Sequence, residues 1–185
     1  MRCGRGVHAD RVGNKDMAAE PIEQRVGDRL AETDATVAVA ESATGGLVCS
    51  LLTDVPGASG YVNRGFVTYA YEAKTSVLGV DRAAIDNHGA VSAPVARQMA
   101  TGARDRAGTT WGVSITGIAG PGGGTIEKPV GTTYIGVAYA GPWGSQSSTV
   151  AVTGYQFEGD RRAIKRAAAD QALTDLAAAI DTHGT

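Results

Sequence analysis

The sequence predicts a three-layer α/β/α sandwich whose sheet is mixed but mostly parallel. Short apolar runs of strand-like composition alternate along the chain with segments of helical periodicity. This order is typical of a sheet that is covered by helices on both faces. Two consecutive strand-like runs, 132–140 and 148–153, have only a Gly-Pro-Trp-Gly turn between them. We therefore expect an antiparallel hairpin within the sheet.

The beginning of the chain lacks this pattern. Residues 1–17 are polar, rich in Gly and Arg, and contain no apolar stretch that would suit a signal peptide. We expect a disordered tail there, with Met17 as an alternative start. The total of 185 residues suits about one domain of ~150 residues, so we assign one domain to residues 18–185.

The first predicted helix follows Pro21, because apolar residues recur there at every fourth position. These residues are Ile22, Val26 and Leu30. The run TVAVA at 36–40 predicts a strand, since it is short, apolar and contains β-branched residues. Small residues at 42–46 interrupt this run, and helical character resumes over 47–52. The local order is therefore strand, turn, helix.

The middle of the chain is expected to begin with a second strand, because the run 61–71 is rich in aromatic and β-branched residues. Two short helical turns are predicted after it, at 74–78 and 81–88, and the second ends at a glycine.

Clear start signals mark the later helices. Ser92 is expected to cap a helix that has Pro94 in its first turn and ends near residue 106. A third strand is predicted over 111–116. The last helix is expected from about 160 to 180, where many alanines give a high helix propensity.

Composition excludes several functional classes. The net charge is −2 and the isoelectric point is near 5.9, so there is no electrostatic argument for nucleic-acid binding. The two cysteines, Cys3 and Cys49, form no CxxC pair, which argues against a disulfide framework or a zinc ribbon. No apolar run approaches the ~20 residues that span a bilayer. We expect a soluble cytoplasmic domain that contains no metal or cofactor.

The turn after the first strand is the strongest candidate site. In open α/β sheets, ligands bind at the carboxyl ends of strands. Ser42 is a potential nucleophile at this position, and either Ser42 or Thr44 would cap the following helix. Gly45 and Gly46 would leave backbone N–H groups open to a phosphate or an oxyanion. The alternative is an ordinary helix cap in which the glycines serve packing.

A serine nucleophile needs a base, and histidine is scarce in this chain. The histidines are His8, His88 and His183, two of them in the tails, and the sequence contains no GxSxG motif. Lys74 can act as the base if burial removes its proton near neutral pH. Tyr69 would then pass the proton or hold the lysine. Taken singly, each has a plain alternative: a solvated lysine and a core tyrosine.

A glycine-rich segment follows the third strand. Thr116 and Gly117 begin it, and the loop continues to residue 131 with several further glycines and two prolines. It should lie at the same sheet edge as Ser42 and form a wall or a lid, or else a flexible connection. Near the last helix, Asp160 is expected as the N-cap. Arg161 would either bind a phosphate or carboxylate or remain an ordinary surface arginine.

Together these segments resemble the CinA C-terminal domain family over about residues 20–180. The resemblance rests on four segments in the same order: 40–46 (AESATGG); 64–69 (RGFVTY) with Glu72, Ala73 and Lys74; 88–92 (HGAVS); and 116–123 (TGIAGPGG) with 128–132 (KPVGT). The run 157–161 (FEGDR) is similar to the last signature of the family.

The resemblance implies an amidase that converts nicotinamide mononucleotide into nicotinic acid mononucleotide and ammonia, in pyridine nucleotide salvage. It implies a serine–lysine dyad, here Ser42 and Lys74, assisted by Tyr69. Thr116 and Arg161 match positions associated with the site. One departure is visible: many members carry cysteine where this chain has Ala43.

We expect Thr44, Gly45, Gly46, Thr116, Gly117 and Arg161 to contact the substrate. The family also implies a homo-oligomer, and the composition indicates no nucleic-acid or membrane partner. Two other functions remain open at this point. One is an amidase for a different amide or phosphorylated substrate. The other is a non-catalytic nucleotide-binding module, or a regulatory module associated with competence and damage.

Overall fold

A five-stranded sheet forms the middle of the computed structural model, which describes residues 20–183; the tail predicted at 1–17 lies outside these residues. The strand order is β2-β1-β3-β4-β5. The strands are β1 (Val37–Glu41), β2 (Val62–Val67), β3 (Trp111–Gly117), β4 (Thr132–Tyr139) and β5 (Thr149–Gln156). β1 is parallel to β2 and β3, whereas β4 is antiparallel to β3 and β5. The mixed sheet and its hairpin are confirmed, and the parallel and antiparallel pairings are equal in number.

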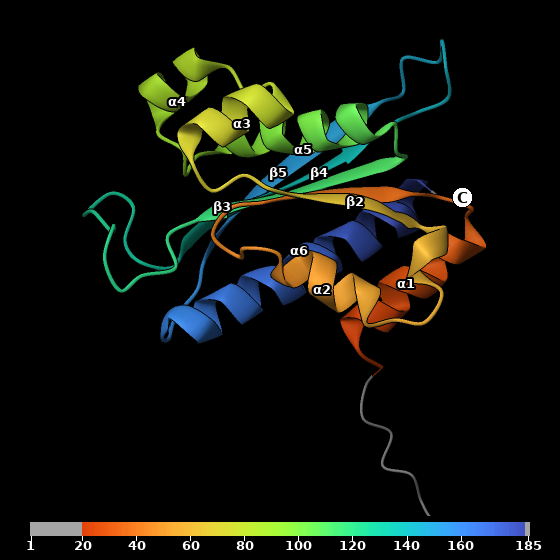
Figure 1. Ribbon diagram of the computed structural model, residues 1–185, viewed down its shortest axis with the longest axis horizontal. Helices are drawn as coiled ribbons and strands as arrows, with labels where there is room; N and C mark the ends of the chain where they lie inside the picture. The colour runs from red at the N-terminus through yellow and green to blue at the C-terminus, as the bar shows by residue number, and fades with distance from the viewer. Residues whose placement is uncertain (1–19, 184–185) are drawn as a thin grey trace, which may run out of the picture.

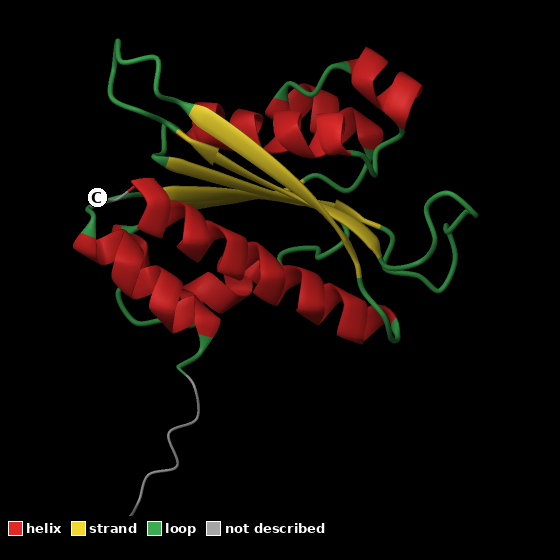
Figure 2. Cartoon of the chain, turned by 180° about the vertical axis from the view of Figure 1, so that it is seen from behind, coloured by secondary structure: helices red, strands yellow, loops and turns green. Residues whose placement is uncertain are grey.

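Helices cover both faces of this sheet, as expected for a three-layer sandwich (Figures 1 and 2). One layer contains α1 (Ile22–Glu32), α2 (Leu47–Thr53) and α6 (Arg161–His183). The opposite layer contains α3 (Tyr71–Leu78), α4 (Arg82–His88) and α5 (Ala93–Ala107). A short 3-10 turn, η1 (Ala58–Gly60), precedes β2. Within residues 20–183, no helix combines the length and the apolar character needed to cross a membrane.

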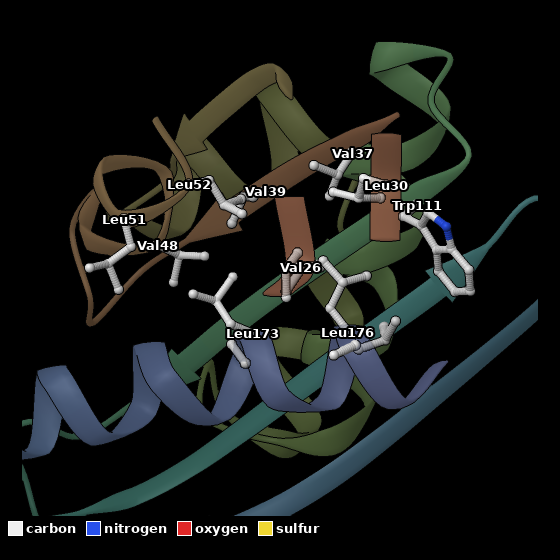
Figure 3. Close-up of a cluster of buried hydrophobic side chains, with 14 of the residues drawn as sticks. Val26, Leu30, Val37, Val39, Val48, Leu51, Leu52, Trp111, Leu173 and Leu176 are labelled. Atoms are coloured by element: carbon white, nitrogen blue, oxygen red, sulfur yellow. The ribbon is translucent and has the colours of Figure 1, made fainter. Parts of the chain in front are cut away.

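Two hydrophobic cores lie on the two sides of the sheet. The larger core joins β1 and β3 to α1, α2 and α6, with Val26, Leu30, Leu173 and Leu176 among its fully buried members (Figure 3). The smaller one lies beneath α3, α4 and α5. Every residue of β1 is buried, because helices cover both of its faces. The rigid centre of the sheet therefore carries the turn that follows β1.

The second strand is shorter than its composition predicts, so the prediction of a strand over 61–71 is wrong at its C-terminal end. β2 ends at Val67, and α3 begins at Tyr71. The last ladder contact is the Thr68 N–H donating to the Glu41 carbonyl at 2.8 Å. Residues 69 and 70, which follow this contact, pair with no strand of the described chain. Tertiary context here overrides the strand propensity of the aromatic residues.

The antiparallel pairing of β3 and β4 sets the route of the glycine-rich loop. Because β4 starts beside the end of β3, the segment 118–131 turns back at the edge where β1 and β2 also end. This is the loop that extends beyond the sheet between β3 and β4 in Figure 1. Three chain segments that follow strands therefore meet at one edge, as expected for a ligand site of an open α/β sheet.

Candidate active site

A cleft of about 200 Å³ opens at this edge of the sheet, and Ser42 lies in it. Ser42 directly follows β1, and its N–H donates to the carbonyl of Ile115 on β3 at 3.0 Å. The serine therefore continues the strand ladder, which fixes its position, and it is only 9% exposed. The other lining residues are Ala43, Tyr69, Tyr71, Lys74, Ala90, Val91, Thr116, Gly117, Ala119 and Arg161.

Lys74 on α3 brings its amine to the serine. Its side chain is 1% exposed, and its Nζ lies 3.1 Å from the Oγ of Ser42. The same Nζ donates to the carbonyl oxygens of Thr68 at 2.7 Å and Tyr69 at 3.2 Å. Both carbonyls belong to the segment between β2 and α3, so the helix and the segment before it hold the amine together.

This arrangement fits a neutral amine. A neutral –NH₂ group has two N–H donors and one lone pair, and the two carbonyls of Thr68 and Tyr69 use both donors. In the charged form, the third N–H donates to the Ser42 Oγ; in the neutral form, the lone pair takes its place and is left for the hydroxyl proton of Ser42. Burial lowers the pKa of Lys74 to about 8, since the charged form loses its hydration. Geometry and protonation therefore both suit a general base.

Glu41, the last residue of β1, caps α2 from inside the protein. Its side chain is fully buried and accepts hydrogen bonds from the N–H groups of Gly46 (2.8 Å), Val48 (3.3 Å) and Cys49 (2.9 Å). The prediction that Ser42 or Thr44 caps this helix is therefore wrong. The prediction that the Gly46 amide is open to a ligand is also wrong, because Glu41 occupies it. A carboxylate suits this position, since the helix dipole favours negative charge there.

The amides just before Gly46 are different. Within the described chain, no hydrogen bond engages the N–H groups of Ala43, Thr44 or Gly45. The Ala43 amide follows the nucleophile directly, the position from which a backbone N–H can reach an oxyanion. The Thr44 side chain is 1% exposed, and its Oγ1 has no hydrogen-bond partner among the described residues. Besides the Ser42 hydroxyl, the turn therefore offers three unengaged backbone amides.

Tyr69 and Arg161 form the rim of the cleft. The Tyr69 side chain is 63% exposed, and its hydroxyl accepts from the Arg161 Nη2 at 3.5 Å. The Arg161 Nη1 donates to the Gly120 carbonyl at 2.6 Å, which connects α6 to the glycine-rich loop. Tyr69 contacts Lys74 through its backbone carbonyl, a contact that does not involve the phenol.

The opposite wall is fixed by hydrogen bonds to consecutive carbonyls before α5. The buried Thr116 hydroxyl donates to Ala90 O at 2.8 Å, the Lys128 Nζ donates to His88 O at 2.7 Å, and the Ser92 Oγ donates to Gly89 O at 2.8 Å. Ser92 occupies the N-cap position of α5, but its side chain makes no cap hydrogen bond, contrary to the prediction. Its hydroxyl stabilises the wall instead.

Most of the predicted site residues meet in this cleft. Ser42, Tyr69, Lys74, Thr116, Gly117 and Arg161 line it, whereas Thr44, Gly45 and Gly46 do not. Sequence reasoning missed Tyr71, which lines the cleft and is 48% exposed, and the capping role of Glu41. An acidic residue just before a glycine turn and a helix was the available signal for that cap. Among the described residues, no group of three His, Cys, Asp or Glu side chains forms a metal site.

Comparison with known proteins gives the family. The model of the CinA C-terminal domain matches residues 19–180. The chain belongs to the CinA C-terminal domain family. A CinA-like protein of Chlorobaculum tepidum is 51% identical over 155 residues, which are 84% of this chain and 36% of that protein. A CinA-like protein of Anaeromyxobacter dehalogenans is 52% identical over 152 residues, 82% of this chain and 36% of that protein. The chain thus spans about a third of these CinA-like proteins.

Solved structures of CinA proteins share the fold. The competence/damage inducible protein CihA of Agrobacterium tumefaciens superposes with a TM-score of 0.80 at 36% identity, covering 88% of this chain and 96% of that one. A CinA superfamily protein of Klebsiella pneumoniae gives a TM-score of 0.81 at 28% identity, covering 87% and 96%. The match to nearly the whole length of these chains agrees with the three-layer architecture.

Proposed function

We propose that this CinA domain is an amidase that hydrolyses the carboxamide of nicotinamide mononucleotide to nicotinic acid mononucleotide and ammonia. The observation that carries the proposal is the buried amine of Lys74, 3.1 Å from the Ser42 hydroxyl, with both N–H donors of its neutral form used by carbonyls. A serine next to an uncharged lysine is an activated nucleophile. The resemblance to the amidase branch of the family supplies the substrate.

The first half of the reaction forms an ester. Ser42 Oγ attacks the carboxamide carbon while its proton moves to the Lys74 Nζ. The resulting oxyanion is stabilised by backbone N–H groups, for which the unengaged Ala43 amide is the nearest candidate. The C–N bond then breaks as Lys74 returns the proton to the leaving nitrogen. Ammonia leaves, and the acyl group stays on the serine.

The second half repeats this proton transfer with water. A water molecule attacks the ester carbon and gives its proton to Lys74, which passes it to Ser42 Oγ as the C–O bond breaks. The products are the free carboxylate and the regenerated serine. A neutral amine is required at the start of each half, so a single base serves both steps.

The test is ammonia release from nicotinamide mononucleotide by the purified chain, with the product identified by mass. Ser42→Ala and Lys74→Met are each expected to lower kcat by at least ~10³-fold, since a nucleophile and its base act as a unit. Ser50→Ala, which alters an exposed serine on α2, is the matched control and should retain the rate. Near-full activity in either site variant would overturn the dyad. Saturable binding without ammonia would instead indicate a non-catalytic nucleotide-binding module.

A further inference from the structure

A second cation lies beside the turn that carries the nucleophile. Lys165 is one helical turn after Arg161 on α6, so the two side chains share a face of the helix. Its Nζ lies 3.7 Å from the position that a Cβ would take on Gly45. Lys165 does not line the cleft itself. It extends the positively charged rim from Arg161 to the outer side of the turn 43–46.

The charge of Lys165 is not compensated within the described chain. Four ion pairs are formed there, and none includes Lys165: Arg29–Asp181, Arg82–Asp86, Arg104–Asp105 and Arg166–Asp170. No hydrogen bond from its amine is formed to residues 20–183 either. By contrast, the next residue, Arg166, forms an ion pair with Asp170 at 2.9 Å. Lys165 is half-buried, so water screens its charge less than that of an exposed lysine.

The other groups near the cleft that attract anions are already in use. Glu41 occupies the first amides of α2. Asp160 caps α6, since its Oδ1 accepts from the N–H groups of Arg162 and Ala163 at 2.9 Å each. Lys128 is bound to the carbonyl of His88. An anion at this rim is therefore left with Lys165, the remaining N–H groups of Arg161 and the unengaged amides of the turn.

We propose that Lys165 binds the phosphate group of the mononucleotide substrate, together with Arg161 and the amides of Thr44 and Gly45. This inference rests on the amidase function proposed above. Its place suits this role, because Gly45 lies in the same turn as the nucleophile, three residues after Ser42, and the Lys165 amine stands beside it. The glycine also matters: its φ is +65°, and a side chain there would stand against Lys165.

The experiment compares Lys165→Gln and Lys165→Glu with the wild-type chain on two substrates. One is nicotinamide mononucleotide; the other is nicotinamide riboside, which has the same carboxamide and no phosphate. Lys165→Gln should raise KM for the mononucleotide roughly tenfold, since a charged hydrogen bond is lost, with kcat changed less than about twofold. Lys165→Glu should raise KM further. The low activity on the riboside should be the same in Lys165→Gln and wild type.

Arg162→Gln is the matched control, because Arg162 is an exposed cation of the same helix turn whose side chain makes no ion pair in the described chain. Its KM should stay within about twofold of wild type. Inorganic phosphate should compete with the mononucleotide in the wild type and do so less in Lys165→Gln. Equal KM values in Lys165→Gln and wild type would overturn this inference alone. Absence of ammonia release by the wild type would overturn the amidase function first.

Discussion

The amine of Lys74 is held by its own chain. Its two carbonyl partners, Thr68 and Tyr69, come six and five residues earlier, so the segment before α3 folds back over the side chain. A lysine held in this way loses little further conformational freedom when the reaction begins. The same segment supplies Tyr69 at the rim, so the base and the rim tyrosine are positioned together.

A pH dependence follows from the lowered pKa of Lys74. The proposed reaction needs the neutral amine, and burial brings its pKa to about 8. We expect kcat/KM for nicotinamide mononucleotide to rise about tenfold per pH unit below pH 8 and to level off above it. The measurement is a pH profile from 6 to 9.5. A flat profile across this range would contradict the role of Lys74 as a neutral base.

Tyr71 offers a second prediction at this scale. It lines the cleft next to Lys74 with about half of its surface exposed, and the pyridine ring of nicotinamide mononucleotide is a cation. Aromatic faces attract such cations by about 0.5–1 kcal/mol at exposed sites. Tyr71→Leu should therefore raise KM about two- to fivefold, whereas Tyr71→Phe should keep the wild-type value. Equal KM values in all three proteins would exclude a ring contact.

At the scale of elements, α2 shows what sequence reasoning reaches and where it stops. The strand–turn–helix order around Ser42 follows from composition, and the structure confirms it. The capping group does not follow, because small hydroxyl residues in the turn are good caps in isolation. The structure places the Glu41 carboxylate there because β1 ends beneath the helix. The local signal is Glu41 itself, an acidic residue just before the glycine turn, but choosing it over the hydroxyl residues requires knowing where β1 ends relative to the helix.

The final helix is the opposite case. Asp160 is the predicted N-cap of α6 and makes the expected bonds, because its carboxylate lies directly before the two N–H groups that it caps. The contact between Ser42 and Lys74 was predicted from the sequence only in part. Residue chemistry alone left the lysine as a candidate base, and the family resemblance selected it. Neither specified the two carbonyls, which depend on how the chain turns between β2 and α3.

α5 packs so closely on β3 that Gly112 has no room for a side chain. A Cβ on Gly112 would meet the Cβ of Arg104 at 2.7 Å and its backbone nitrogen at 2.9 Å, in addition to the carbonyl of Ala100. Because a helix backbone cannot move aside cheaply, Gly112→Ala should lower the free energy of unfolding by about 2–3 kcal/mol. Gly122→Ala, where a Cβ would meet nothing within 4 Å, is the matched control. Denaturant unfolding of both variants measures the difference.

At the scale of the whole molecule, the cleft joins parts that pack on different sides of the sheet. Ser42 follows a central strand, Lys74 belongs to the layer of α3, and Arg161 starts the helix of the other layer. The glycine-rich loop connects to both layers, since Arg161 holds its Gly120 and its Lys128 holds His88 at the end of α4. A ligand in the cleft therefore contacts both layers at once.

Ligand binding should accordingly stabilise the entire chain. In Ser42→Ala, which cannot form the ester, nicotinamide mononucleotide at 100 times its Kd adds about 2.7 kcal/mol to the free energy of unfolding. For a chain of this length that raises Tm by about 5 °C or more. Thermal unfolding of Ser42→Ala with and without the nucleotide measures the shift. No shift at millimolar nucleotide would contradict binding in this cleft.

The reversal of direction between β3 and β4 has a consequence for divergence within the family. A parallel neighbour would have required a crossover away from this edge, whereas the antiparallel one leaves a long connection beside the reacting serine. Insertions or deletions in that connection would change one wall of the cleft and leave the pairing of the strands unchanged. Such changes leave the nucleophile in place after β1 and its base in place on α3.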